Sequence, residues 1–264
     1  MKSMQILRPS PCPLPQGEGD FAQGAAQTTL SIAGFSLLEL MIVLVIVLSI
    51  TAAIFQTINV TTQRSSTEQT KLDMFQEARE FMDQMSRDLR QAGYPNTRNL
   101  DPSLFTQNPI INDLHAAAGL VEVNSGELWF EGDVDGSGMV SSVRYHLDTS
   151  TANNCPCLRR SAVYKVNGDP VNGQPPTYQV EVQGVQNTNI FSAFAGGASV
   201  GLPVTIATAT GTTIAGVDTV KATLSLQASN VDPQTGQYPT ATLVTTVRLN
   251  NCSQAAIGYK TSCN

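Results

Sequence analysis

The sequence of 264 residues has few charged side chains and few histidines. Asp, Glu, Lys and Arg make up 14% of the chain, against roughly a quarter in an average soluble domain. The 15 basic residues are outnumbered by 21 acidic ones, which gives a net charge of −6. A nucleic-acid-binding protein needs a basic surplus to neutralise phosphates, so we do not expect a nucleic-acid partner.

The residue types that serve enzyme active sites are also scarce. Only two histidines, His115 and His146, are present, and they lie far apart. We expect both to be structural or solvent-facing, and we expect the single tryptophan, Trp129, to belong to the core. Walker, Rossmann and nucleophile-elbow motifs are missing. The sequence therefore predicts no enzyme.

Long hydrophobic runs are missing except for one near the N-terminus. Residues 35–55 read FSLLELMIVLVIVLSITAAIF, and 17 of these 21 residues are apolar. A helix of ~20 such residues spans the hydrocarbon core of a bilayer. We therefore predict one transmembrane helix at residues 35–55, with a large domain on the far side of the membrane. The run is too long for the apolar region of a secretory signal peptide, which has ~7–15 residues.

Glu39 places a carboxylate inside this apolar run. An ionisable side chain at such depth costs ~2.5–3.5 kcal/mol on insertion scales and indicates a functional role. The run contains no basic residue. A cut between Gly34 and Phe35 would create a new α-amine at Phe35, one helical turn before Glu39. That amine could pair with Glu39 of the same chain or of a neighbouring copy, which would make the pair a device for ordered assembly.

The sequence GFSLLE at residues 34–39, followed by a long apolar helix, resembles the processing motif of type IV pilins and pseudopilins. The resemblance implies that a prepilin peptidase cuts after Gly34 and N-methylates Phe35. It also implies that Glu39 helps to incorporate the subunit into a filament. Residues 1–34 would be the leader that is removed. They depart from the usual short basic leader, because Lys2 and Arg8 are cancelled by Glu18 and Asp20.

Three further stretches resemble the PilW-type minor pilins: RDLRQAGY at 87–94, WFEGDVDG at 129–136 and VRLN at 247–250. The resemblance implies a minor pilin that takes part in pilus assembly or priming. It would reside in the inner membrane with its globular domain in the periplasm. From there it could be incorporated into the extracellular pilus. Its partners would be other pilins, the prepilin peptidase, the inner membrane and the pilus assembly machinery. Two alternatives are a type II secretion pseudopilin and a membrane-tethered binding domain that never enters a filament.

The N-terminal helix is predicted to continue beyond the membrane, through residues 56–94. Apolar residues recur there at spacings of three, four and seven, which is typical of a helix with one buried face. This stripe comprises Leu72, Phe75, Ala78, Phe81, Met82, Met85 and Leu89. Gly93 and Pro95 then end the helix. We expect the stripe to pack on the following domain; a coiled-coil stalk is the alternative.

Residues 95–264 change to a composition typical of strands and turns, and we expect a mainly antiparallel β-rich domain. The predicted strands are residues 120–123, 127–131, 140–147, 157–166, 178–183, 217–227 and 240–249. Residues 196–216 are expected to be a loop or an irregular edge segment. The predicted fold class is α+β, with the long helix packed against a mainly antiparallel sheet, as in the type IV pilin fold that the resemblance implies.

Four cysteines remain outside the leader: Cys155, Cys157, Cys252 and Cys263. An even number of cysteines outside the cytoplasm favours disulfides. We expect Cys155 and Cys157 each to pair with one of the two C-terminal cysteines, because a bond between Cys155 and Cys157 would close a very short loop. A zinc site is the alternative.

The stretch DVDGSG at residues 133–138 resembles the start of a calcium-binding loop. Asp133, Asp135 and Ser137 offer oxygen ligands at alternate positions, followed by glycine. The twelfth position of the loop is Arg144, where an EF-hand has glutamate. We expect a plain hairpin turn, with calcium as the weaker alternative and no other cofactor.

Overall fold

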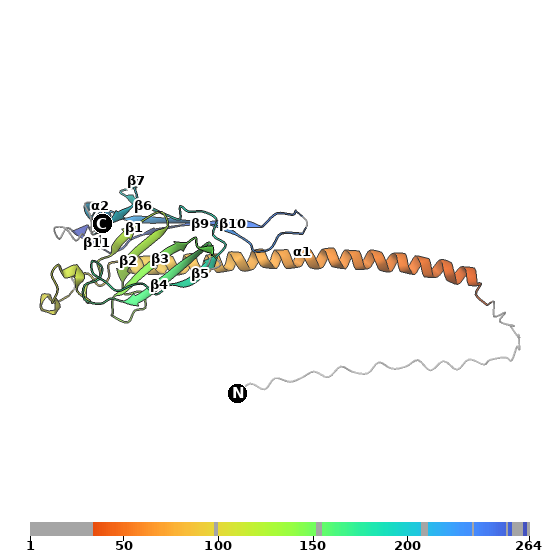
Figure 1. The fold of residues 1–264 in the computed structure, drawn as a ribbon, viewed down its shortest axis with the longest axis horizontal. Coiled ribbons are helices and arrows are strands. Elements are labelled where there is room, and N and C mark those ends of the chain that lie inside the picture. The colour runs from red at the N-terminus through yellow and green to blue at the C-terminus, as the bar shows by residue number, and fades with distance from the viewer. Residues whose placement is uncertain are drawn as a thin grey trace, which may run out of the picture. The chain divides into compact units, whose positions relative to one another are not determined.

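The computed structural model describes residues 34–97, 100–151, 155–206, 211–233, 235–251, 253–254 and 261–262. The chain divides into two compact units, Met1–Ile54 and Phe55–Asn264. Apart from Gly34, the predicted leader lies outside the described residues. The architecture is α+β: a long N-terminal helix is followed by a domain of antiparallel strands (Figure 1). This agrees with the predicted fold class and is consistent with a pilin-like fold.

Helix α1, Leu37–Gln91, contains 55 residues without a glycine or a proline, so nothing in its sequence breaks the helix. It ends where the sequence predicts. Gly93 adopts a φ of 81°, the left-handed conformation typical of helix C-termini. Its backbone N–H donates to the carbonyl of Glu131 at 2.8 Å, so the helix passes directly into a contact with the sheet.

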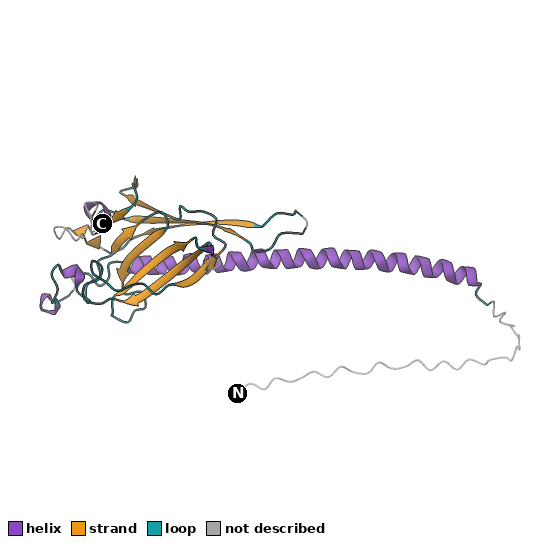
Figure 2. Cartoon of the chain, viewed as in Figure 1, coloured by secondary structure: helices purple, strands orange, loops and turns teal. Residues whose placement is uncertain are grey.

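Two antiparallel sheets form most of the second unit (Figure 2). The six-stranded sheet has the order β5-β4-β3-β2-β1-β8, and the four-stranded sheet has the order β10-β9-β6-β7. The strands of the first sheet are β1 (Leu120–Val123), β2 (Glu127–Gly132), β3 (Ser141–Asp148), β4 (Cys157–Tyr164), β5 (Gln179–Gln183) and β8 (Val204–Thr205). Those of the second are β6 (Phe191–Ala195), β7 (Ala198–Val200), β9 (Thr219–Gln227) and β10 (Thr240–Arg248).

Shorter elements complete the described part of the domain. They are the 3-10 helices η2 (Pro102–Leu104) and η3 (Ile110–Asn112), helix α2 (Gly211–Ala215), and the two-stranded sheet of β11 (Ser253–Gln254) and β12 (Thr261–Ser262). Strands β7 and β8 each lie at a sheet edge. The segment 196–216, expected to be a loop or an irregular edge, therefore holds two short edge strands and the start of a helix.

The core forms where the C-terminal part of α1 meets the sheets. The buried residues of α1 are Ala78, Phe81, Met82, Met85, Asp88 and Leu89. They pack with alternate residues of the strands, most regularly along β9, where every second side chain is buried. The prediction that α1 packs on the following domain is confirmed for this part of the helix.

The predicted stripe is wrong at its upper end. Leu72 is 62% exposed and Phe75 is 44% exposed. Burial along α1 begins only at Ala78. A helical period shows which face of a helix is apolar, but it does not show where along the helix the packing against a sheet starts.

The junction between α1 and β2 requires a glycine. Ala92 forms a backbone bridge to Gly132, and the N–H of Asp133 donates to the carbonyl of Tyr94 at 2.8 Å. A Cβ atom on Gly132 would lie 2.3 Å from the carbonyl oxygen of Gln91. Only glycine permits this close approach of the two backbones.

Candidate functional site

The described chain begins with an exposed segment outside any helix. Gly34, Phe35 and Ser36 precede α1, and the Phe35 side chain is 80% exposed. The first helical hydrogen bond runs from the N–H of Leu40 to the carbonyl of Ser36 at 3.1 Å. Exposed backbone outside regular structure is what proteases cut. The peptide bond between Gly34 and Phe35 therefore lies in exposed, non-helical backbone.

The helix that follows presents apolar side chains on every side. Residues 37–55 are all exposed, and the large apolar side chains among them are more than half exposed. These 19 residues measure ~28 Å at 1.5 Å per residue, close to the thickness of a bilayer core. In the described part of the chain, α1 is the one helix long and apolar enough to cross a membrane. This is consistent with a membrane anchor.

Two of the polar side chains in this stretch satisfy their hydrogen bonds within the helix. The hydroxyl of Ser49 donates to the carbonyl of Val45 at 2.8 Å, and the hydroxyl of Thr51 donates to the carbonyl of Val47 at 2.7 Å. Such bonds make serine and threonine compatible with hydrocarbon.

Glu39 differs from these residues, because it is exposed and forms no ion pair with any residue that the structure describes. A carboxylate that enters an apolar layer without a partner among the described residues needs a cation from elsewhere. Phe35, whose backbone nitrogen is the predicted cation, lies four residues earlier and just ahead of the first turn of α1.

A buried polar cluster connects the lower part of α1 to the large sheet. The Tyr145 hydroxyl of β3 donates to the Asp88 carboxylate at 2.8 Å, and Arg160 of β4 donates to the same oxygen at 2.8 and 3.1 Å. Burial, together with the negative charge of Asp88, raises the pKa of Tyr145 well above its usual value. Phe81 packs edge-on against the Tyr145 ring, with 5.5 Å between ring centroids. The cluster attaches the helix to the sheet. Asp88 and Arg160 also line a cavity at this junction.

A second buried ion pair lies on the other face of the sheet. Lys165 and Glu131 have fully buried side chains and are 2.6 Å apart. The Lys165 ammonium also donates to the carbonyls of Ile111 and Ala116, while Glu131 accepts the N–H of Ala118. Burial raises the pKa of Glu131, and the adjacent Lys165 opposes this shift. With all three ammonium donors used, this pair holds a loop onto the sheet.

Asp113 organises the same loop. Its carboxylate accepts the backbone N–H groups of Thr106, Gln107 and His115, and it contacts the His115 ring at 2.8 Å. Burial of Asp113 opposes ionisation, but the hydrogen bonds outweigh it and lower its pKa to about 2. His115 is therefore structural, as expected. Sequence reasoning missed Asp113, Asp88 and Lys165, because nothing local distinguishes a charged residue that becomes buried.

The expected cysteine pairing is wrong. Cys155 and Cys157 form a disulfide with each other, and their Cα atoms are 4.5 Å apart, within the range that disulfides use. The chain bends at Pro156, which brings the two side chains together. Cys252 and Cys263 lie outside the residues described to side-chain level. Asp148 is close to the pair, but cysteines in a disulfide do not offer the thiolates that zinc needs.

The other predicted residues lie on β2, on β3 and in the loop that joins them. Asp133, Asp135 and Ser137 form the connection between β2 and β3, so a hairpin loop is present there. Trp129 is half-buried at the margin of the core, with the Arg144 guanidinium 3.6 Å above its ring. His146 lies 3.6 Å from Glu127 in the neighbouring strand.

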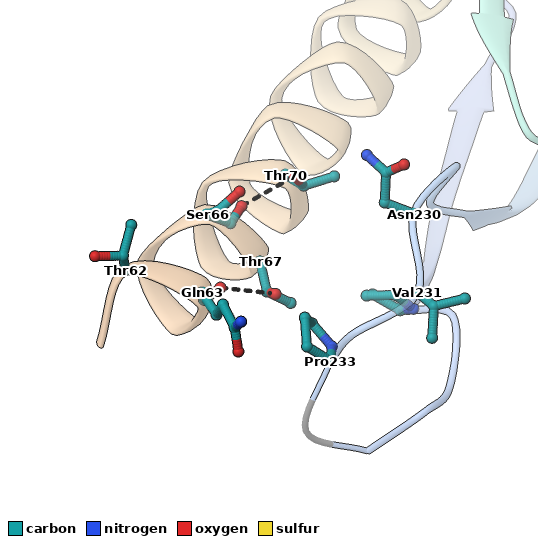
Figure 3. Close-up of a pocket in the computed structure, with 9 residues that line it drawn as sticks. Thr62, Gln63, Ser66, Thr67, Thr70, Asn230, Val231 and Pro233 are labelled. Atoms are coloured by element: carbon teal, nitrogen blue, oxygen red, sulfur yellow. Dashed lines mark hydrogen bonds between the residues drawn. The ribbon is translucent and has the colours of Figure 1, made fainter. Parts of the chain in front are cut away.

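A groove lies between α1 and the loop joining β9 to β10 (Figure 3). Its volume is about 310 Å³, and it is lined by Thr62, Gln63, Ser66, Thr67, Thr70, Asn230, Val231, Pro233 and Pro239. The hydroxyls of Thr67 and Thr70 donate to the carbonyls of Gln63 and Ser66 in their own helix. No charged side chain lines the groove, so it offers little for catalysis or for binding a charged ligand.

Comparison of the chain with protein-family models and with curated proteins finds no match. The function must therefore be argued from the residues themselves. Of the features described above, the exposed segment at Gly34 and the apolar helix with Glu39 are those that a folded domain alone does not explain.

Proposed function

We propose that this protein is a minor type IV pilin of the PilW type, processed between Gly34 and Phe35 and assembled into a filament through α1. The supporting observation is Glu39, an exposed carboxylate without an ion-pair partner among the described residues, in the part of α1 (residues 37–55) whose large apolar side chains are all exposed. An isolated folded domain is not stabilised by such exposed apolar side chains and an unpaired carboxylate. A bundle of identical helices can bury the apolar side chains and pair the carboxylate.

The chemistry of assembly follows from the charge. In the membrane, an unpaired carboxylate costs ~2.5–3.5 kcal/mol. After the cut, the Phe35 amine of one subunit provides the cation for Glu39 of the next. The pair between two subunits forms only when their helices pack at one register. Pairing removes the cost of the unpaired charge, and this stabilises the assembled state at that register. Apolar side chains along residues 37–55 would then form the filament core.

The remaining features agree with a subunit that waits in the inner membrane with its domain in the periplasm. The Cys155–Cys157 disulfide is typical of proteins outside the cytoplasm. The expected partners are other pilins, the inner membrane, the prepilin peptidase and the pilus assembly machinery. A direct role in nucleic-acid binding is not part of the proposal, because the chain is acidic.

The test compares Glu39→Gln with the control Glu68→Gln in cells that assemble the filament. Glu68 lies on the same helix, but it is exposed and pairs only with Lys71. We expect Glu39→Gln to be processed and to remain in the membrane, with at least a tenfold loss from the sheared filament fraction, while Glu68→Gln behaves as wild type. Equal incorporation of both variants would show that Glu39 does not direct assembly, and absence of the wild-type protein from the filament fraction would favour a tethered binding domain. Deletion that abolishes enzyme export but spares surface pili would instead identify a secretion pseudopilin.

A further inference from the structure

The loop between β2 and β3 contains an acidic oxygen that lacks a donor. Asp133 is only 6% exposed. Its Oδ2 accepts the backbone N–H of Gly138 at 2.9 Å. Its Oδ1 is shielded from solvent and accepts no hydrogen bond from any residue that the structure describes. A buried carboxylate oxygen without a donor is costly, because nothing replaces the water it has lost.

A second carboxylate lies beside it. The side chain of Asp135 is within hydrogen-bonding reach of Asp133. The backbone N–H of Ser137 donates to the Oδ1 of Asp135 at 3.0 Å. Two carboxylates side by side repel each other unless a positive charge lies between them.

The described part of the chain does not supply that charge. Neither carboxylate forms an ion pair with a lysine or an arginine. Arg160 and Arg87 line the same cavity as Asp135; Arg160 is bonded to Asp88, and Arg87 forms no ion pair with either carboxylate. Arg144 lies over the ring of Trp129. The nearby Tyr164 donates its hydroxyl to Asp135 at 3.0 Å, and it remains neutral.

We propose that this loop binds a calcium ion, with Asp133, Asp135 and Ser137 as oxygen ligands. Calcium prefers carboxylate and other oxygen ligands and tolerates irregular geometry, whereas magnesium demands a nearly ideal octahedron. The inference does not depend on the proposed function.

The affinity should be weak. Arg144 occupies the position at which an EF-hand supplies a bidentate glutamate. A site with two carboxylates and no such glutamate belongs with the extracellular calcium modules, whose Kd is ~10⁻⁴–10⁻³ M. Such a site would fill outside the cytoplasm, where calcium reaches this range.

The position of the loop shows what the ion would do. The backbone N–H of Asp133 donates to Tyr94, just after the end of α1. Calcium bound at Asp133 would therefore stiffen the junction at which the helix is attached to the sheet. We expect calcium to raise the thermal unfolding midpoint of the whole chain.

Calcium titration calorimetry on the full chain in detergent tests the site. The variants are Asp133→Asn, Asp135→Asn and Ser137→Ala. The control is Asp101→Asn, because Asp101 also caps a short turn through a serine N–H but has no second carboxylate nearby in sequence. We expect one calcium ion per wild-type chain, unchanged binding in the control, at least tenfold weaker binding in Asp133→Asn and Asp135→Asn, and weak magnesium binding throughout.

Two results would overturn the inference. One is an absence of calcium binding by the wild type at calcium concentrations up to ten times the expected Kd. The other is wild-type affinity in the aspartate variants, which would place the ion elsewhere on the surface. Circular dichroism shows whether each variant is folded. Should Asp133→Asn fail to fold, the exposed residues Asp135 and Ser137 decide the question, because their side chains are not part of the core.

Discussion

Several charged residues that the sequence did not single out are buried in this domain and held by specific hydrogen bonds. Asp113 is the clearest case. Its side chain is only 1% exposed, and its carboxylate accepts hydrogen bonds from several backbone N–H groups. Its pKa of about 2 lies below the usual aspartate value of 3.8. The stability it contributes is therefore fully present above pH 3.8 and is lost as the pH falls through about 2.

We predict that Asp113→Asn lowers the free energy of unfolding by about 2 kcal/mol at pH 7, since the amide cannot accept from Thr106 and Gln107 as the carboxylate does. The difference from wild type should shrink when the pH approaches 2. Urea unfolding in detergent at both pH values measures it. An equal difference at the two pH values would show that ionisation of Asp113 is not the cause.

The cysteines give a second prediction at this scale. Trypsin releases residues 145–159 as one peptide that contains both Cys155 and Cys157. We predict that its mass in the unreduced digest is lower by two hydrogens, as an internal disulfide requires. Recovery of this peptide linked to residues 249–260 or 261–264, which carry Cys252 and Cys263, would restore the pairing expected from sequence.

Among the elements, α1 serves two different environments. The apolar side chains of residues 37–55 are exposed, Met74 is partly buried against the core, and full burial begins at Ala78. Leu89 and Leu72 belong to the same predicted stripe, but the first is fully buried and the second is 62% exposed.

This contrast predicts a large difference between two identical substitutions. Leu89→Ala should cost ~2–5 kcal/mol of unfolding free energy, because it leaves a cavity in the core. Leu72→Ala should change it by no more than ~0.5 kcal/mol. Chemical unfolding of the two variants in the same detergent compares them directly. Similar losses would mean that packing along α1 extends further than the structure shows.

The sequence predicted the elements better than it predicted the contacts between them. The continuous helix, its end at Gly93 and seven strands could be read from apolar periods and turn residues, because these signals are local. The edge strands β7 and β8 were missed, since they are only three and two residues long, and β6, an inner strand of five residues, was missed as well. The partners of Asp88 and Lys165 come from chain segments far apart in the sequence, and the partner of Cys155 depends on a local bend. The spacing of apolar residues along the chain carries no information about either.

The same division holds at the candidate site. Gly34, Phe35 and Glu39 could be identified from their spacing before an apolar run. The donor-free oxygen of Asp133 could not, because burial of one carboxylate oxygen depends on how the β2–β3 loop meets the end of α1.

For the whole molecule, the account combines a membrane anchor with a disulfide-containing antiparallel β domain. The anchor by itself would explain attachment to a membrane. It would not explain a carboxylate four residues after Phe35, which gains a partner only if a new amine is created at that position.

The mass of the intact protein extracted from the membranes of its host tests this central claim most directly. The account predicts a chain that begins at Phe35 and carries one additional methyl group on its terminal nitrogen. A chain that retains the residues before Phe35 would contradict it, because Glu39 would then have no cation to meet and filament assembly through α1 would lose its basis.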